Sequence, residues 1–189
     1  MRIIAGNLKG SKLYIPKDKD TRPLRDLARE SIFNLLVHSN KITLELEDSN
    51  VLDLFAGTGS FGLECLSRRA KNVSFVEKGN DISKILKKNI SKLKMQEKSS
   101  IFCDDVFSLI KKNIFLKSSF DLIFCDPPFN EAKIENLMEI IFNKKLLKKN
   151  GIIVLHRRVN TDDKFSNKFK ILEIRKYGIS KIIFGKLLF

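Results

Sequence analysis

Short apolar runs alternate with helical patterns along most of the chain, and this alternation constrains the fold more than any other feature. Runs typical of strands occupy residues 51–55, 73–76, 101–103, 120–125 and 152–155. Apolar residues at helical spacing lie between these runs, at 60–67, 82–93, 106–110 and 134–147. Strands separated by helices of this size join through right-handed crossovers. The pattern therefore predicts an α/β fold with a mostly parallel, doubly wound sheet.

Both ends of the chain depart from this alternation. Residues 2–16 contain two short β-like stretches, which predict a small N-terminal β-hairpin. Pro23 then suits the first position of a helix that carries apolar residues at helical spacing. Three arginines at steps of three and four predict a basic face on that helix: Arg22, Arg25 and Arg29. At the other end, the runs 169–176 and 179–184 predict a C-terminal antiparallel hairpin.

Length and composition predict one main domain with a short extension. A chain of 189 residues, 43% of them hydrophobic, can build a full core without a disulfide or a metal. We expect a basic N-terminal extension over residues 1–40 and the main domain over residues 41–189. The three cysteines lack any spacing that holds zinc, so we expect reduced thiols and no metal. The N-terminus is too polar for a signal peptide and the apolar runs are too short to span a bilayer, which predicts a cytoplasmic protein without a membrane partner.

The net charge of +14 is concentrated at the two ends of the sequence. Residues 1–40 carry eight Lys and Arg against four Asp and Glu, and residues 139–189 carry thirteen against four. Basic surfaces of this kind neutralise phosphates, so we expect a nucleic-acid partner. Solvated side chains in a Lys-rich composition are the alternative explanation, and the charge alone does not decide between the two.

A glycine-rich loop follows the first strand of the predicted sheet. In a strand–turn–helix setting, such glycines let the backbone approach a ligand closely, with the N-terminus of the helix behind it. The second strand ends at Glu77, roughly 20 residues further on, where such folds place an acid that binds ribose hydroxyls. We therefore expect a nucleoside-containing cofactor, either a dinucleotide or S-adenosylmethionine. Its predicted binding residues are Asp53, Phe55, Ala56, Gly57, Thr58, Gly59, Gly62 and Glu77.

A second loop, Asp126-Pro127-Pro128-Phe129, follows the strand 120–125, where an open α/β sheet places its active site. The exocyclic amine of a nucleobase is a poor nucleophile until acceptors hold its hydrogens and free its lone pair. The Asp126 carboxylate and the Pro127 carbonyl could accept these two hydrogen bonds, and Phe129 could stack on a flipped base. These four residues are the predicted catalytic loop for methyl transfer from S-adenosylmethionine. An ordinary turn is the alternative interpretation.

Other polar residues give weaker signals. Asp104 follows the third strand, where a carboxylate could accept from the adenine amino group of the cofactor. Its neighbour Asp105 competes for that role, and a helix cap is the alternative for either residue. His38 and His156 have no partner at ligand spacing, so we expect surface or strand-end residues and no metal ligands.

Taken together, these residues resemble a known family. The Asp126–Phe129 loop after a glycine-rich loop is similar to that of amino-methyltransferases acting on DNA adenine, RNA guanine or protein glutamine. The N-terminal combination is more specific, and it resembles the bacterial 16S ribosomal RNA guanine-N2 methyltransferases of the RsmD type over nearly the whole chain. It consists of Arg2-Ile3-Ile4-Ala5-Gly6, Gly10, Leu13, Thr21-Arg22-Pro23, Arg29-Glu30 and Phe33-Asn34.

The resemblance implies a Rossmann-like class I methyltransferase fold and S-adenosylmethionine as the cofactor. It implies that the substrate is a guanine in 16S rRNA, in the small ribosomal subunit or its assembly intermediate. It further implies that Asp104 lines the cofactor pocket and that Thr21 and Arg22 meet cofactor or RNA. His156 and Ala5 depart from the family pattern, which has an acid and a glycine there. We expect neither of them to touch the catalytic loop.

Three other functions compete with this interpretation. A DNA adenine N6 methyltransferase uses the same loop, although a chain of this length leaves little room for a separate sequence-reading domain. A non-catalytic RNA-binding factor of ribosome assembly explains the basic ends, but the intact glycines and catalytic loop argue against it. An NAD-dependent oxidoreductase leaves the Asp126–Phe129 loop without a role.

Overall fold

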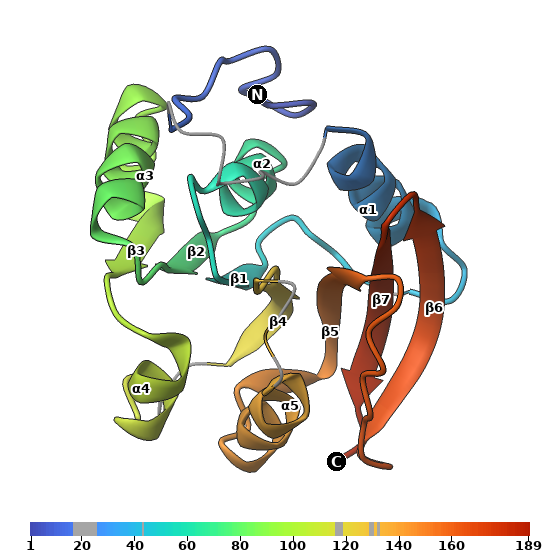
Figure 1. Cartoon of the computed structure of the whole chain (residues 1–189). Helices are drawn as coiled ribbons and strands as arrows, with labels where there is room; N and C mark the ends of the chain where they lie inside the picture. Colours follow the sequence, from blue (N-terminus) through green and yellow to red (C-terminus); the bar gives the residue numbers. More distant parts are fainter. Residues whose placement is uncertain (17–25, 43, 116–118, 129–130, 132) are drawn as a thin grey trace.

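The computed structural model describes residues 1–16, 26–42, 44–115, 119–128, 131 and 133–189. At its centre is a seven-stranded sheet with the strand order β3-β2-β1-β4-β5-β7-β6 (Figure 1). The parallel strands are β1 (Asn50–Leu54), β2 (Asn72–Val76), β3 (Ser99–Phe102), β4 (Phe120–Cys125) and β5 (Leu147–Arg158). The antiparallel strands β7 (Ser180–Leu187) and β6 (Phe169–Tyr177) follow on the far side of β5. The predicted α/β fold, parallel centre and terminal hairpin are confirmed.

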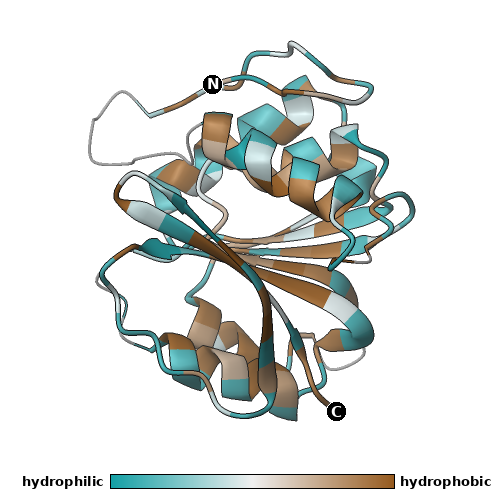
Figure 2. Ribbon diagram, turned by 90° about the vertical axis from the view of Figure 1, so that its right-hand side faces the viewer, coloured by the Kyte–Doolittle hydropathy of each residue, from teal (hydrophilic) through white to brown (hydrophobic). Residues whose placement is uncertain are grey.

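Helices cover both faces of the sheet (Figure 2). One face carries α1 (Asp26–His38), α2 (Ser60–Ser67) and α3 (Asn80–Lys92), and the other carries α4 (Val106–Lys111) and α5 (Ile134–Asn143). A short 3-10 turn, Gln96–Lys98, precedes β3. Because successive strand residues point to opposite faces, Val51 of β1 packs in the α1–α3 layer while Leu52 and Leu54 pack in the α4–α5 layer.

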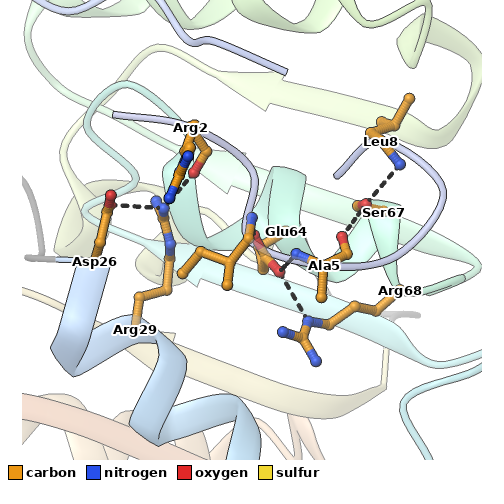
Figure 3. Close-up of polar contacts among 9 residues, drawn as sticks. Arg2, Ala5, Leu8, Asp26, Arg29, Glu64, Ser67 and Arg68 are labelled. Carbon is orange, nitrogen blue, oxygen red and sulfur yellow. Dashed lines mark hydrogen bonds and ion pairs between the residues drawn. The ribbon is translucent and has the colours of Figure 1, made fainter. Parts of the chain in front are cut away.

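The N-terminal segment forms only a short version of the predicted hairpin, in which the N–H of Ile3 donates to the carbonyl of Ser11 (3.0 Å) and that of Leu13 donates to the carbonyl of Met1 (3.2 Å). Its one antiparallel bridge joins Arg2 and Lys12, and the residues between them curl against α2. After Ile3 the chain turns to Glu64 of α2, whose buried carboxylate accepts from the backbone N–H groups of Ile4 (2.7 Å) and Ala5 (2.9 Å) (Figure 3). A helix side chain, and not a partner strand, therefore satisfies these two backbone donors.

Two expectations about α1 and one about α5 are corrected. Arg29 is fully buried and not part of a solvated basic face, because it donates to Asp26 (2.9 Å) and to the carbonyl of Arg2. Leu27 is one of the apolar residues whose helical spacing predicts a position facing the core, but it is 72% exposed. Helix α5 ends at Asn143 and β5 begins at Leu147, because Lys145 between them adopts a left-handed φ of 51°. None of the helices that the structure describes is long and apolar enough to cross a membrane.

Candidate active site

A cleft of about 1080 Å³ opens at the carboxyl ends of the parallel strands. It lies beside β1 and β4, from which the chain proceeds toward opposite edges of the sheet, so it occupies the topological switch point. Nine of the predicted site residues line it: Asp53, Phe55, Ala56, Gly57, Thr58, Glu77, Asp126, Pro127 and Pro128. The fold thus brings the predicted cofactor loop and the predicted catalytic loop to one cleft.

The glycines of the glycine-rich loop lie in two kinds of surroundings, the cleft and the core. Gly57 lines the cleft, whereas Gly59 and Gly62 pack beneath it. Gly59 has a φ of +84° and precedes α2, and a Cβ there would lie 2.4 Å from the Leu86 side chain. A Cβ on Gly62 would lie 2.3 Å from the Phe75 ring. These two glycines therefore shape the loop and α2 through close packing and do not reach the cleft surface.

Asp53 is a buried carboxylate at the cleft floor. Its Oδ2 accepts from the backbone N–H of Gly62 (3.0 Å), while its buried Oδ1 has no hydrogen-bond partner among the described residues. Burial raises the pKa of Asp53 well above its usual range, with the charges of Asp126 and Glu77 adding to the effect against the Gly62 hydrogen bond. The site therefore holds an unpaired polar oxygen that a ligand donor or the carboxyl's own proton must satisfy.

Hydrogen bonds of the Glu77 side chain connect the glycine-rich loop to the end of β2. Its Oε2 accepts from the backbone N–H of Gly57 (2.8 Å) and its Oε1 accepts from that of Gly79 (2.7 Å). Because each carboxylate oxygen has two lone pairs, both oxygens retain capacity for a hydroxyl donor. Glu77 is half-buried on the cleft wall, so the acid expected from its spacing meets the cleft as well as the loop.

The side chains of the two aspartates after β3, Asp104 and Asp105, point in different directions. Asp104 turns away from the cleft to pair with Lys112 (2.9 Å), and this hydrogen bond lowers the pKa of Asp104. Asp105 lines the cleft, and its Oδ1 caps α4 by accepting from the N–H groups of Phe107 and Ser108. Between these two predicted candidates, the cleft wall therefore contains Asp105.

The catalytic loop begins directly after β4. The Asp126 side chain is 23% exposed to the cleft, Pro127 is buried and Pro128 is exposed. Phe129, expected to stack on a base, lies outside the described residues, as do Thr21 and Arg22. The loop thus presents one carboxylate to the cleft on a backbone that two prolines stiffen.

His156 touches the catalytic loop, contrary to the expectation from the sequence. Its Nδ1 lies 2.7 Å from Oδ1 of Asp126, and the residue is 9% exposed at the carboxyl end of β5. The reason is the pairing of β4 with β5, which sets Cys125 opposite Leu155 and so brings the next residue of each strand together. Its place at the end of a predicted parallel strand was the one signal in the sequence for this contact.

No pattern in the sequence predicted the ion cluster behind the loop. Arg157, almost fully buried, donates to the carbonyl of Glu131 (2.9 Å) and pairs with Asp163 (2.8 Å). Lys181 and Thr161 also contact Asp163. Burial raises the pKa of Asp163, but the hydrogen bonds from these three neighbours outweigh it, so the pKa is lowered. Through Arg157, this cluster holds the backbone of Glu131, three positions after Pro128.

Among the described residues, no three His, Cys, Asp or Glu side chains gather where they could hold a metal ion. The cysteines in this part of the chain are free, with Cys65 and Cys125 buried and Cys103 exposed. Burial is the main cause that raises the pKa of the Cys65 and Cys125 thiols, which keeps them protonated.

The family is decided by comparison with known proteins. A family model described as Conserved hypothetical protein 95 matches residues 1–186. The chain belongs to this family. It is 34% identical over 153 residues to the "Ribosomal RNA small subunit methyltransferase D" of Haemophilus influenzae, covering 81% of this chain and 76% of that protein. The predicted RsmD-like family is confirmed.

Solved structures agree with the RsmD-like fold. A methyltransferase candidate from Escherichia coli, yhhF, superposes with a TM-score of 0.84 at 26% identity and covers 99% of this chain and 97% of that one. A SAM-dependent methyltransferase candidate from Streptococcus mutans has a TM-score of 0.65 at 17% identity, over 82% of this chain and 48% of that one. The second likeness concerns the fold alone. The chain has the predicted class I methyltransferase fold.

The cleft of this RsmD-like chain fits S-adenosylmethionine. The cofactor carries an ammonium group, ribose hydroxyls and an adenine amino group, all of which are hydrogen-bond donors. The cleft offers carboxylates to match, including the unpaired Oδ1 of Asp53 and the half-buried Glu77. Apart from its chain neighbours, no described residue has an atom within 4 Å of where a Cβ of Gly57 would stand, so the loop leaves room for a ligand close to its backbone.

Proposed function

We propose that this chain transfers a methyl group from S-adenosylmethionine to the exocyclic N2 amine of a guanine in 16S rRNA, in the small ribosomal subunit or its assembly intermediate. The observation that carries the proposal is the Asp126 carboxylate, which opens into the same cleft as the glycine-rich loop and Glu77. Membership of a family that includes a small-subunit rRNA methyltransferase supports this choice of substrate.

The cofactor would occupy the side of the cleft next to β1 and β2. Glu77 would accept from the ribose hydroxyls, Asp53 would meet the methionine end, and Asp105 would accept from the adenine amino group. When bound, S-adenosylmethionine supplies an electrophilic methyl group on a sulfonium sulfur. The protein supplies binding and alignment, which brings the two reactants to reacting distance without a separate nucleophile.

Asp126 and Pro127 would prepare the amine. The N2 lone pair of guanine is delocalised into the ring, and two acceptors that hold the two amine hydrogens localise it on nitrogen. Oδ2 of Asp126 and the carbonyl of Pro127 are the two acceptors of the loop. The methylated amine carries one excess proton, and the Asp126 carboxylate is the group placed to take it.

The substrate would enter from the open side of the cleft. A base must leave its stack to reach a carboxylate at the end of a strand, and the prolines hold the loop in a fixed shape for it. Phe129 would stack on this base. The target guanine would therefore lie in a loop or a distorted segment of 16S rRNA, where unstacking costs least.

The test uses the full chain, S-adenosylmethionine and small ribosomal subunits that lack the modification. After incubation, the RNA is digested to nucleosides and analysed by mass spectrometry, and N2-methylguanosine is expected. Asp126→Ala should lose at least 100-fold in product formation, while cofactor affinity by calorimetry stays within a few-fold, because a loop at a strand end contributes little to the core.

The matched control is Asp81→Ala, which removes an exposed carboxylate of α3 whose ion-pair partner among the described residues is Lys84. It should form product at the native rate. Methyladenosine as the product would contradict the guanine assignment and favour a DNA-type amino-methyltransferase. Tight cofactor binding without any methylated nucleoside would contradict the enzyme and favour an assembly factor.

A further inference from the structure

The contact between His156 and Asp126 has no role in the steps proposed above. The two side chains come from adjacent strands, 30 positions apart in the sequence, and meet with 2.7 Å between Nδ1 and Oδ1. Both residues line the cleft, and the exposed fractions of their side chains are 11% for His156 and 23% for Asp126. A close, largely desolvated pair at the reacting edge of the sheet affects how Asp126 can be used.

We propose that His156 is a positioning residue for Asp126: it holds Oδ1, leaves Oδ2 for the substrate amine, and through its protonation state sets how strongly the carboxylate accepts. This inference rests on the proposed function, because it assigns the amine to Asp126. It adds a residue that fixes the orientation of the carboxylate and makes methyl transfer depend on pH.

The chemistry of the pair determines which nitrogen carries the proton. An ionised carboxylate only accepts hydrogen bonds, so Nδ1 of His156 must donate. The neutral imidazole is then the Nδ1–H tautomer, which is opposite to the form that free histidine side chains favour. With Oδ1 engaged by this donor, the carboxyl group no longer rotates freely, and its second oxygen keeps one direction.

The backbone on both sides of the pair is fixed. On the β4 side, the N–H of Asp126 donates to the carbonyl of Leu54 (3.4 Å). On the β5 side, His156 pairs with Ile182 of β7, and the next residue, Arg157, is held by Asp163. His156 can therefore act as a rigid support, as a positioning residue requires.

Protonation of His156 weakens Asp126 as an acceptor. An imidazolium beside the carboxylate forms an ion pair that draws its charge away from the substrate amine, whereas the neutral ring leaves that charge available. Methyl transfer should accordingly rise with pH as His156 loses its proton. Other described titratable or charged groups around the pair are Asp53, Glu77, Lys78, Asp105, Cys125, Glu131, Arg157, Lys176, Tyr177 and Lys181.

The first test reads the proton directly and needs no activity. The chain has two histidines, so the imidazole signals of a ¹⁵N-labelled sample are assigned with the single variant His38→Asn. We expect neutral His156 as the Nδ1–H tautomer in the native chain and a shift toward Nε2–H in Asp126→Ala. An Nε2–H tautomer in the native chain, or an unchanged tautomer in the variant, overturns the proposed hydrogen bond from His156 to Asp126.

The second test measures single-turnover methyl transfer to small ribosomal subunits against pH. His156→Leu removes the donor and should slow transfer about tenfold or more with cofactor affinity within twofold of native. His156→Asn places an amide N–H near the position of Nδ1, so it should recover to within about threefold of native at high pH. It should also lack the acid limb that the imidazole causes.

His38→Asn, an identical substitution on the exposed end of α1, is the control and should keep the native rate and profile. Because Asp53 and the other neighbours are present in every variant, the difference between native and His156→Asn profiles isolates the imidazole. A native rate in folded His156→Leu, or equal rates in both variants, overturns the inference. A native chain that methylates nothing contradicts the proposed function instead. The tautomer measurement still tests whether His156 donates a hydrogen bond to Asp126.

Discussion

Individual carboxylates in the cleft have different tasks because their surroundings differ. Glu77 is half-buried and accepts from two backbone N–H groups of neighbouring loops. Asp53 is fully enclosed, with one oxygen bound to Gly62 and the other without a partner among the described residues. One residue is therefore suited to bind hydroxyl donors, and the other responds to pH and to what fills the cleft.

At Glu77, replacement by Ala should weaken S-adenosylmethionine binding by roughly 1.5 to 3 kcal/mol, about 10- to 150-fold, because charge-assisted hydrogen bonds are lost. Calorimetric titration measures the change. Glu97→Ala, at an exposed glutamate outside the cleft, is the control and should bind as the native chain does. Unchanged affinity in Glu77→Ala would remove this residue from the cofactor site.

At Asp53, the raised pKa predicts how stability depends on pH. In the unfolded chain Asp53 releases its proton at a pH of about 4, whereas in the folded chain it keeps this proton to a higher pH. The native free energy of unfolding should therefore decline as pH rises from about 4 toward the folded pKa. Asp53→Asn, which keeps an oxygen for the Gly62 N–H, should lack this decline. Urea unfolding of both chains between pH 5 and 8 measures it, and parallel curves would contradict the expectation.

At the scale of elements, α2 connects the N-terminal segment to the cofactor loop. The helix begins after Gly59, and its buried Glu64 binds Ile4, Ala5 and the Arg68 side chain (Figure 3). Ser67 adds an acceptor for the N–H of Leu8 (3.0 Å). Side-chain acceptors of α2 therefore hold the N-terminal segment, in addition to its own short antiparallel pairing around Arg2 and Lys12.

Glu64→Ala should destabilise the chain by about 3 kcal/mol, because two backbone donors and the partner Arg68 lose their acceptor in a buried site. Urea unfolding gives the free energy. The control is Glu47→Ala, which breaks the exposed ion pair with Arg69 and should cost less than about 1 kcal/mol. Similar losses in the two variants would show that the Glu64 hydrogen bonds do not hold the segment.

At the scale of the whole molecule, the positive charge is not arranged as its position in the sequence suggests. Lys148 and Lys149 belong to a basic run, but they lie near the start of β5, at the sheet edge opposite the cleft, and Lys148 pairs with Asp121. Lys176, at the end of β6, is exposed on the cleft rim. RNA that reaches the cleft would therefore contact Lys176 and not Lys148 or Lys149.

Lys176→Glu should therefore weaken RNA affinity several-fold and reduce the salt slope by about one, whereas Lys149→Glu should change both little. Binding to small-subunit RNA, measured across a series of salt concentrations, compares the two charge reversals. Cofactor affinity should stay unchanged in both. Equal effects of the two variants, or an RNA affinity that does not change with salt concentration, would contradict a role of Lys176 in RNA binding. The positive charge would then reflect the Lys-rich composition of the chain.

The sequence by itself determined the order of strands and helices, the glycine-rich loop and the loop that begins at Asp126. Each of these is a property of contiguous residues, since periodicity and strand-end position are local patterns. The parallel sheet followed from the crossover rule, and with it the meeting of both loops at one edge.

Only the tertiary structure decided which side chains meet across elements. The register of β4 with β5 brought His156 to Asp126, and the packing of the N-terminal segment on α2 buried Arg29 and Glu64. It likewise turned Asp104 toward Lys112 and left Asp105 on the cleft wall. Such contacts join residues that are distant in the chain or differ only in the face they occupy, and no local pattern encodes them. Strand register and helix packing determine them, because these fix direction as well as proximity.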